Sequence, residues 1–502
     1  MEEDKYLKLQ NGSDVRGIAI TNGSETQNLT PEIIKNICTA FTDYVAKKYS
    51  IPYDKVIIGV GHDSRLSAET LKAGVIKGVQ SRKSVCMDCG LVSTPSMFMS
   101  TILEASAFHG AIMITASHLP FNRNGLKFFT REGGLESKDI KVILEAAANL
   151  KETEEEASIA EVKSFDLIHY YSEHIKNLIK KEVQAAEYDQ PLKGLHIVVD
   201  AGNGACGFFT REILIPLGAD TTGSVFLDPD GNFPNHIPNP ENPQAMEAIQ
   251  KATVNSKADL GVIFDCDGDR AAVVMSDGQE VNRNALIALM AAIVSEKYPG
   301  TTVVTDSVTS DYLTEFLEND LKMKHLRFKR GYKNVINESI RLNNSGEESH
   351  LAIETSGHGA LKENYFSDDG AYMSVKIICK MAKLKRENKE LKSLISGLKY
   401  PAESEEYRLS IMTEDFKAYG NQVLKDFVVF AEQQSFHVVK DNYEGVRISF
   451  QDEEVSGWIL VRMSLHDPII PINIEANAVG GVEIILNRVR PFFASCNQLS
   501  NL

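Results

Sequence analysis

Three stretches of the chain share one pattern of apolar and polar positions. Each begins with a run of β-branched apolar residues, passes through an aspartate and a turn rich in glycine or serine, and ends in a segment with helical periodicity. The stretches are 55–78 with Asp63, 195–218 with Asp200, and 302–317 with Asp306. Apolar runs that alternate with amphipathic segments are typical of mixed or parallel sheets, so we expect three related α/β domains.

The pattern changes after residue 401. A helix is expected at 414–434 and a closing helix at 479–494. Between them lie short apolar runs that predict strands at 436–439, 446–450, 458–462 and 470–475. One helix followed by consecutive strands predicts a smaller α+β domain. The expected domains are 1–160, 161–281, 282–400 and 401–502, with a charge-rich link at 151–157.

Composition narrows the class of protein. The 502 residues are 43% hydrophobic, enough for several cores, and 53 basic against 69 acidic side chains give a net charge of −16. Such a charge repels polyanions, so we expect neither a nucleic-acid nor a membrane partner. The longest apolar run, 285–294, is about half the length of a membrane span.

Seven scattered cysteines and an acidic N-terminus predict a cytoplasmic protein, or one of an organellar stroma if a transit peptide has been removed. Cys86 and Cys89 form one C-x-x-C without a second pair at zinc spacing, so we expect idle thiols.

The segment 110–129, GAIMITASHLPFNRNGLKFF, carries a candidate nucleophile. Ser117 ends a buried strand, His118 follows it, and a loop shaped by proline, asparagine and glycine leads to a second run that contains Lys127. A serine in this setting can carry an acyl or phosphoryl group. It can also be a loop serine that bonds its own backbone.

The segment DCDGDR, residues 265–270, follows another buried strand. Asp265, Asp267 and Asp269 alternate in a tight loop, where three carboxylates ionise at low cost only beside a cation. Oxygen-only ligands favour Mg²⁺. An EF-hand would need glycine sixth and glutamate twelfth, where this chain has Arg270 and Ser276.

Three further segments are ambiguous on their own. Gly202, Gly204 and Gly207 spell the dinucleotide fingerprint between a strand and a helix, with Asp228 closing the next strand. The loop ETSGHG, 354–359, offers groups suited to a polyhydroxyl ligand, or simply turn chemistry. The loop RMSLHDP, 462–468, offers a bidentate arginine for phosphate, or a salt-bridged surface loop.

Taken together, these segments resemble the α-D-phosphohexomutase superfamily, which includes phosphoglucomutase/phosphomannomutase and phosphoglucosamine mutase. ITASHLP resembles its phosphoserine loop, DCDGDR its magnesium loop, ETSGHG its sugar-binding loop and RMSLHDP its phosphate-binding loop, in the family's order. Smaller matches are DVRG at 14–17, VGHDSR at 60–65 and FPNHIPNP at 233–240. The resemblance implies an α/β fold of four domains around a central cleft, with three related mixed α/β domains and a C-terminal α+β domain. It also reduces the glycine fingerprint to a structural turn.

The resemblance implies an intramolecular phosphotransferase that interconverts hexose 1-phosphate and hexose 6-phosphate through a phosphoserine and a bisphosphate intermediate. Its partners are then small sugar phosphates and a hexose bisphosphate, its cofactor is Mg²⁺, and the chain is a monomer or dimer. The implied catalytic residues are Ser117, Lys127, His118, Arg16 and His358. The implied metal ligands are Ser117, Asp265, Asp267 and Asp269, and the implied substrate-binding residues are Arg270, Lys329, Lys333, Glu354, Ser356, His358, Arg462, Ser464 and His466.

The phosphate loop departs from the family pattern R-x-S-G-T-x-P. Leu465 lacks the freedom of glycine, and His466 titrates near neutrality where the family has threonine. We therefore expect substrate affinity to depend unusually on pH. A phosphoglucosamine mutase on the same site, an NAD(P)-binding oxidoreductase and a non-catalytic sugar-phosphate sensor remain the alternatives.

Overall fold

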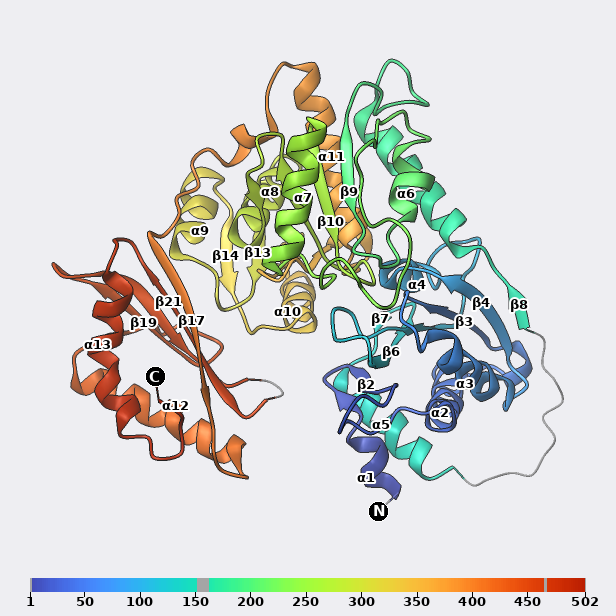
Figure 1. Ribbon diagram of the computed structural model, residues 1–502, viewed down its shortest axis with the longest axis horizontal. Helices are drawn as coiled ribbons and strands as arrows, with labels where there is room; N and C mark the ends of the chain where they lie inside the picture. The colour runs from blue at the N-terminus through green and yellow to red at the C-terminus, as the bar shows by residue number, and fades with distance from the viewer. Residues whose placement is uncertain (1, 151–161, 465–466, 502) are drawn as a thin grey trace. The chain divides into compact units, whose positions relative to one another are not determined.

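The chain forms two compact units in the computed structural model, which describes residues 2–150, 162–464 and 467–501 (Figure 1). The first unit contains residues 1–293 and 356–394, and the second contains 294–355 and 395–502. The link expected at 151–157 lies outside the described residues, as do Leu465 and His466.

The N-terminal sheet of the first unit has the strand order β1-β2-β6-β5-β3-β4-β8, and β7 pairs with β6. Its parallel half is β5-β3-β4-β8, and β1, β2, β6 and β7 join by antiparallel pairing. The strands are β1 (Gln10–Asn11), β2 (Asp14–Ile18), β3 (Ile57–His62), β4 (Val85–Leu91), β5 (Gly110–Ile114), β6 (Arg123–Thr130), β7 (Gly133–Gly134) and β8 (Val162–Ser164). The helices are α1 (Glu2–Leu7), α2 (Pro31–Tyr49), α3 (Ala68–Gln80), α4 (Thr94–Met99) and α5 (Ser137–Ala148), with a 3₁₀ turn η1 (Tyr53–Lys55).

Local sequence explains the longest of these helices. The Thr30 hydroxyl accepts from the N–H of Ile33 at the start of α2, and Pro31 occupies the first turn, where no backbone donor is needed. Apolar side chains at helical spacing, including Ile34, Ile37 and Phe41, are fully buried in the core of this region. The helix packs against α3 and α5.

A second sheet of the first unit has the order β12-β11-β10-β9. Parallel pairing joins β9 to β10, and the hairpin β10–β11 encloses the acidic loop 265–270. The strands are β9 (Ile197–Asp200), β10 (Leu260–Phe264), β11 (Ala271–Met275) and β12 (Glu280–Val281). The other elements here are α6 (Leu167–Val183), the π-helical segment η2 (Phe209–Leu214), α7 (Pro243–Ser256), β16 (Gly359–Leu361), the 3₁₀ turn η4 (Lys362–Asn364) and α11 (Gly370–Arg386). Helix α8 (Arg283–Ser295) and the 3₁₀ turn η5 (Leu391–Ile395) each extend across a border between the two units along the chain.

In the second unit, β14, β13 and β15 pair in parallel, in that order. They are β13 (Thr302–Thr305), β14 (Lys324–Arg327) and β15 (Leu351–Ile353), and the helical elements are α9 (Asp311–Glu315), the π-helical segment η3 (Phe316–Asp320) and α10 (Tyr332–Asn344).

The C-terminal sheet has the antiparallel order β17-β21-β20-β19-β18. Helices α12 and α13 cover one of its faces (Figure 1). The bounds are β17 (Glu403–Ser410), α12 (Phe416–Gln433), β18 (His437–Val438), β19 (Val446–Gln451), β20 (Ser456–Val461), β21 (Ile469–Ala476) and α13 (Gly481–Ala494). The four strands and two helices expected after residue 401 are present. The sequence did not predict β17.

A buried cation ties this sheet to the preceding part of the second unit. The Arg447 guanidinium stacks 3.7 Å from the centre of the Trp458 ring and donates to Asp311 over 2.9 Å. Burial, and the nearby charge of Arg327, lower the pKa of Arg447 to about 9.

The three expected βα units differ in their helical halves. A regular helix, α3, follows the first strand, whereas only the π-helical segment η2 follows β9, and the helix after β13 changes from α9 to η3. Asp63, Asp200 and Asp306 each follow or end their strand and are fully buried. Among the described residues, none of the helices has the length and hydropathy that a membrane span requires.

Candidate active site

The loop that follows β5 carries the candidate nucleophile. Ser117 has a φ of 51°, in the left-handed region that side chains other than glycine rarely adopt. Its backbone N–H donates to the Thr115 hydroxyl over 2.8 Å, and that hydroxyl donates to Asp63 over 2.6 Å. The Ser117 hydroxyl donates to Asp265 over 3.0 Å. The structure therefore brings the serine loop to the acidic loop.

The acidic loop places three carboxylates together. Asp265, Asp267 and Asp269 are buried, and one oxygen from each lies within 4.8 Å of the others. Oδ1 of Asp265 accepts from the backbone N–H of Gly268, whose φ of 77° forms the turn. Oδ1 of Asp267 and Oδ1 of Asp269 are buried and have no hydrogen-bond donor among the described residues. Unpaired buried carboxylate oxygens fit a bound cation.

The charges of this cluster are only partly balanced by protein groups. Burial, followed by repulsion from Asp269 and Asp267, raises the pKa of Asp265 well above its usual value. Lys127, on β6, forms an ion pair with Asp269 and lies 3.5 Å from Asp267. Burial alone would raise the pKa of Asp269, but Lys127 and other nearby cations lower it. The donor set is oxygen-only, which suits a hard divalent ion such as Mg²⁺.

Arg16, on β2, reaches the same loop from the neighbouring strand. Its guanidinium donates to the carbonyl of Thr115 and to Asp14, the latter over 2.8 Å. Strand β2 pairs with β6, which carries Lys127, so the sheet places both cations beside the serine loop.

His118 is held as a neutral acceptor. The Arg270 guanidinium donates to Nδ1 of His118 over 2.9 Å, and the Ser117 hydroxyl lies 3.3 Å from the same nitrogen. The charge of Arg270, together with burial, lowers the pKa of His118 to about 2. His118 is therefore uncharged at neutral pH, which suits a residue that orients the serine loop rather than a general acid.

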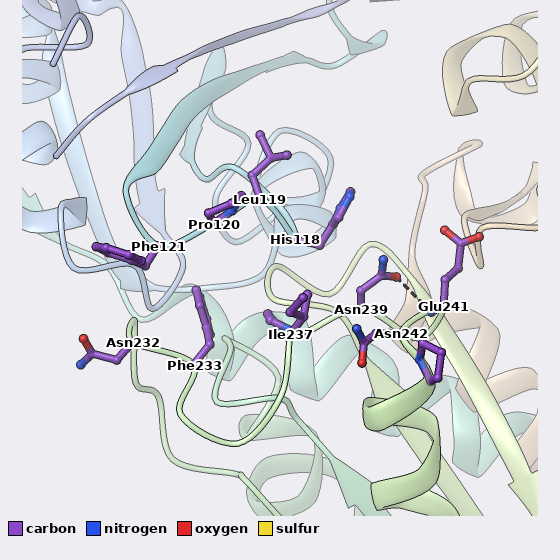
Figure 2. Close-up of a pocket in the computed structure, with 12 residues that line it drawn as sticks. His118, Leu119, Pro120, Phe121, Asn232, Phe233, Ile237, Asn239, Glu241 and Asn242 are labelled. Atoms are coloured by element: carbon purple, nitrogen blue, oxygen red, sulfur yellow. Dashed lines mark hydrogen bonds between the residues drawn. The ribbon is translucent and has the colours of Figure 1, made fainter. Parts of the chain in front are cut away.

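A pocket of about 540 Å³ lies beside His118 (Figure 2). One wall is the loop that holds Phe121, and the facing wall carries Phe233, Ile237 and Glu241. None of the described residues that line it is a lysine or an arginine. Without a cation among its lining residues, this pocket does not suit a phosphate group.

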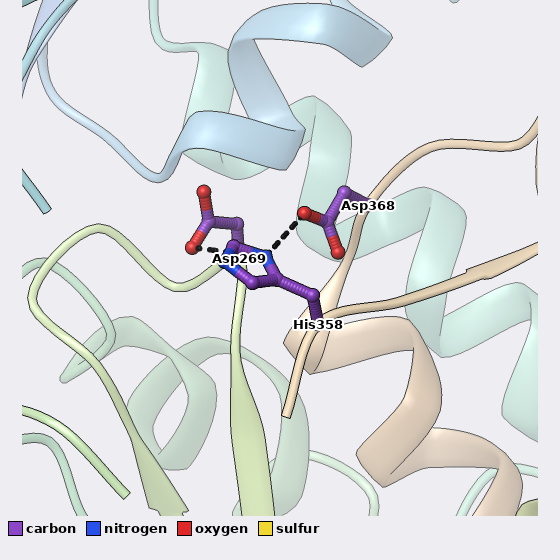
Figure 3. Close-up of side chains that lie close together, drawn as sticks. All are labelled: Asp269, His358 and Asp368. Atoms are coloured by element: carbon purple, nitrogen blue, oxygen red, sulfur yellow. Dashed lines mark hydrogen bonds and ion pairs between the residues drawn. The ribbon is translucent and has the colours of Figure 1, made fainter. Parts of the chain in front are cut away.

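His358 lies between the carboxylates of Asp269, in the acidic loop, and Asp368 (Figure 3). Nδ1 of His358 forms an ion pair with Asp368 and lies 3.9 Å from Asp269. Burial alone would lower the pKa of His358, but the charges of Asp368 and Asp269 raise it above its usual value. Its protonated form is thus favoured near the acidic loop.

The second unit contains the loop 462–468 and the first two residues of the loop 354–359, whose remaining residues belong to the first unit. Glu354 is buried and accepts the backbone N–H of Gly331 over 2.6 Å at the start of α10. Arg330 lies 3.6 Å from the buried Asp306, and its backbone N–H donates to Glu444 over 3.2 Å.

Arg462 lies directly after β20 and is 7% exposed. Its Nε is buried and has no hydrogen-bond partner among the described residues. Burial, and then the charge of Arg330, lower the pKa of Arg462. Two guanidinium groups therefore lie close enough to repel one another, which is the electrostatic setting of an anion site.

The remaining predicted residues are less defined. Lys329 is exposed, 5.9 Å from the centre of the Phe328 ring, and Lys333 lies in the first turn of α10. The Ser464 hydroxyl accepts the N–H of Asp467 over 3.2 Å. Ser356 belongs to the first unit, and its buried hydroxyl has no hydrogen-bond partner there among the described residues. The structure does not describe His466.

Family models match three consecutive parts of the chain. They are the phosphoglucomutase/phosphomannomutase alpha/beta/alpha domains I, II and III, at residues 7–155, 169–278 and 282–399. A phosphoglucomutase/phosphomannomutase of Thermococcus kodakarensis is 31% identical over 94% of this chain and 95% of its own length. The chain belongs to the phosphoglucomutase/phosphomannomutase family.

Other comparisons agree with this family. A phosphomannomutase/phosphoglucomutase of Pseudomonas putida is 28% identical over 87% of this chain and 86% of its own length. A crystal structure of a phosphoglucomutase/phosphomannomutase family protein from Burkholderia thailandensis matches the fold with a TM-score of 0.78, at 24% identity over 99% of this chain and 98% of that one. As a phosphohexomutase, the chain is an isomerase. The mixed α/β fold with three related domains and a β-rich C-terminal domain is confirmed.

The glycine fingerprint of this phosphohexomutase has a packing role. A Cβ on Gly204 would lie 2.4 Å from the carbonyl oxygen of Cys266, within the acidic loop. A Cβ on Gly207 would lie 2.1 Å from the carbonyl oxygen of Leu227. Glycine is required here because two backbones approach closely. Cys86 and Cys89 are buried free thiols, and burial raises the pKa of each to about 12.

Sequence reasoning missed several residues of the phosphohexomutase site. Arg65 and Thr115 support the serine loop, Asp368 pairs with His358, and Arg330 lies near Arg462. Only Arg65 had a signal in the sequence, as the last residue of the VGHDSR match. The others are found only once the chain has folded.

Proposed function

We propose that this phosphohexomutase interconverts hexose 1-phosphate and hexose 6-phosphate, with glucose or mannose as the sugar, through phosphorylated Ser117. The observation that carries the proposal is the 3.0 Å contact between the Ser117 hydroxyl and Asp265, in a buried cluster of three carboxylates and a lysine. Both features are expected for phosphoryl transfer, which depends on positioning and charge neutralisation.

The proposed reaction has two balanced transfers. In the first, the bond between phosphorus and the Ser117 oxygen breaks while the 6-hydroxyl of a hexose 1-phosphate bonds to the same phosphorus. The Ser117 oxygen keeps the electron pair of the broken bond, and the hydroxyl proton passes to Nζ of Lys127, which accepts it in its uncharged amine form. Asp269 stabilises the ammonium ion that results. In the second, the phosphoryl group at position 1 of the bisphosphate returns to the Ser117 oxygen and leaves hexose 6-phosphate. His358, whose pKa is raised, is the proposed proton donor at the leaving oxygen in the reversed orientation.

The residues that would hold Mg²⁺ are Asp265, Asp267, Asp269 and the Ser117 oxygen. Support comes from Oδ1 of Asp267 and Oδ1 of Asp269, which accept no hydrogen bond from the described residues, and from the oxygen-only donor set. When bound, Mg²⁺ neutralises charge on the phosphoryl oxygens as a Lewis acid. Around it, Arg16 adds positive charge to the serine loop.

Substrate recognition is assigned to other groups. His118 and Arg270 orient the serine loop, Glu354 and Ser356 bind sugar hydroxyls, and the non-reacting phosphate binds Arg462 and Ser464, with Arg330 as an added cation. Lys329, Lys333 and His466 complete the proposed set. The Nε of Arg462, which has no hydrogen-bond partner within the described part of the chain, supports an anion at that position.

Several finer points remain part of the proposal. The domain bounds are 1–160, 161–281, 282–400 and 401–502, and the chain acts as a monomer or dimer without nucleic acid or membrane. A cytoplasmic location is supported by seven free cysteines, with an organellar stroma as the alternative. The second candidate reaction is that of phosphoglucosamine mutase, because the residue types of the loop 354–358 do not decide the substituent at position 2 of the sugar.

A coupled assay tests the reaction directly. Glucose, mannose, glucosamine and N-acetylglucosamine 1-phosphates are each supplied with Mg²⁺ and the matching bisphosphate. We expect turnover of the glucose or mannose compound and its loss in Ser117→Ala, with Ser106→Ala as the matched control. No turnover of any sugar phosphate by the wild type would refute the mutase function, and full activity of Ser117→Ala would refute the role of Ser117.

A further inference from the structure

The backbone of the serine loop is bound by one buried side chain from another part of the same sheet. Arg65 follows β3, is 2% exposed, and donates to four carbonyl oxygens of the loop. Nη1 donates to Pro120 over 2.8 Å and to Arg123 over 3.0 Å. Nη2 donates to Ser117 itself and to Leu119, the latter over 2.5 Å. The loop is thus wrapped around a single guanidinium.

The guanidinium is itself fixed on its remaining sides. Its Nε lies 3.3 Å from Asp63, which is fully buried, and the Phe233 ring centre is 5.4 Å from Cζ. Asp63 also accepts the Thr115 hydroxyl, which in turn accepts the N–H of Ser117. Asp63 therefore supports the serine from both sides, through Arg65 at its carbonyl and through Thr115 at its N–H.

These contacts stabilise an unfavourable backbone conformation of the loop. Ser117 occupies the left-handed region, and such a conformation persists only where the surroundings hold it. The loop carbonyls turn inward, where each needs a donor. Arginine offers five N–H groups in a rigid planar fork, whereas lysine offers three donors on one nitrogen and cannot match four carbonyls spread over seven residues.

We propose that Arg65 is a positioning residue for phosphoryl transfer: it holds the Ser117 oxygen at the acidic loop, through the loop backbone and without contacting a reacting atom. The inference rests on the proposed function, in which Ser117 carries the phosphoryl group. Among the described residues, the hydrogen bonds and the ion pair of the Arg65 guanidinium go to carbonyl oxygens of residues 117–123 and to Asp63. Loss of Arg65 therefore lowers kcat and leaves KM nearly unchanged.

The experiment compares Arg65→Lys with the wild type in the mutase assay. Arg82→Lys is the control, because Arg82 is a partly exposed arginine of the first unit, bonded to Asp43 through Nε and Nη2 over 2.6 and 2.8 Å and not to the serine loop. We expect kcat of Arg65→Lys to fall about 10²-fold, as for a misplaced catalytic group, with KM within about threefold. Phosphorylation of Ser117 by the hexose bisphosphate, followed by intact-protein mass spectrometry, slows by the same factor. Arg82→Lys keeps its kcat and KM.

Thr115→Val provides a second, independent arm. It removes the acceptor of the Ser117 N–H and leaves the Arg65 bonds in place, so kcat falls about tenfold at constant KM. If Arg65→Lys does not fold, Arg65→Gln replaces it in the same assay. Wild-type kcat in the folded Arg65 variant, or equal losses in that variant and Arg82→Lys, overturns the role of Arg65, and wild-type kcat in Thr115→Val overturns the need for a fixed loop backbone. A wild type that turns over no hexose phosphate refutes the proposed function instead.

Discussion

Each unit of the molecule buries atoms of charged groups that lack a hydrogen-bond partner among the described residues, and the two sets of groups have opposite charge. In the first, the acidic loop buries carboxylate oxygens of Asp267 and Asp269 that have no donor among the described residues. In the second, Arg462 buries an Nε donor that has no acceptor there, and a second guanidinium, Arg330, lowers its pKa. In the proposed function, a divalent cation would neutralise the first group of charges and a phosphate dianion the second. The first unit would then carry the metal and the phosphoserine, and the second unit the cations that bind the non-reacting phosphate.

Removing one carboxylate from the acidic loop has the largest expected effect on this comparison. Asp267→Asn keeps the shape of the side chain but removes its charge, so Mg²⁺ binds weakly and kcat falls about 10³-fold. In the absence of metal the same variant is expected to have a higher melting temperature than the wild type, because repulsion in the cluster is reduced. Mutase assays, calorimetric titration with Mg²⁺ and thermal unfolding measure the three effects.

The control for this prediction is Asp277→Asn, in the exposed turn after β11, where Asp277 pairs with Lys392 over 2.7 Å. It is expected to keep activity and Mg²⁺ affinity. Unchanged Mg²⁺ affinity in Asp267→Asn would show that the acidic loop is not the metal site.

Removing the guanidinium of Arg462 tests whether the second unit binds the phosphate group. We expect Arg462→Gln to raise KM for hexose phosphate about 10²-fold and to change kcat by only a few-fold, because a charge-assisted bidentate contact to phosphate is lost. Steady-state kinetics measure both constants, and Arg408→Gln, on the exposed strand β17, is the control. A change confined to kcat would assign Arg462 to the chemical step and contradict its proposed role in phosphate binding.

Asp369 can be compared with Asp267 and Asp269. It is also a buried carboxylate of the first unit, but both of its oxygens accept hydrogen bonds. Tyr171 donates to both oxygens over 2.9 and 2.8 Å, and the Tyr372 N–H donates over 2.8 Å at the start of α11. Burial nevertheless raises the pKa of Asp369 from 3.8 to about 6. The folded state therefore binds a proton at a pH where the unfolded chain has released it.

The sign of the pH effect follows from this difference. The contribution of Asp369 to the free energy of unfolding is complete below about pH 4 and is lost as the pH rises to about 6, by on the order of 2 kcal/mol. Asp369→Asn is expected to remove this slope. Denaturant unfolding of both proteins from pH 4 to 7 measures the difference, and identical slopes would contradict the raised pKa.

Short-range pattern predicted much of the fold and of the site. Ser117 and the three aspartates were found because each lies in a compact segment after an apolar strand, where the chain itself sets the geometry. Strand β17 was missed because Glu403–Ser410 carries charged residues on both faces, which is typical of an exposed edge. The π-helical segment after β9 was missed because helical periodicity does not distinguish such a variant.

Partners distant in the chain were beyond this reasoning. The bond between Arg65 and Pro120 spans 55 positions, and that between Ser117 and Asp265 spans 148. Pairing of β3 with β5 sets the first, whereas the second joins the loop after β5 to the loop between β10 and β11. His358 and Asp368 are only 10 positions apart, yet their pairing depends on the turn that precedes α11.

The left-handed backbone at Ser117 also restricts which alcohol can occupy that position. Threonine carries the same hydroxyl, but its branched Cβ crowds the neighbouring carbonyl at positive φ. Ser117→Thr, a mild substitution on most protein surfaces, is therefore destabilising here. Threonine at position 117 would therefore disrupt the loop, even though it keeps a hydroxyl group. The choice of serine is thus imposed by torsion angles as well as by reactivity.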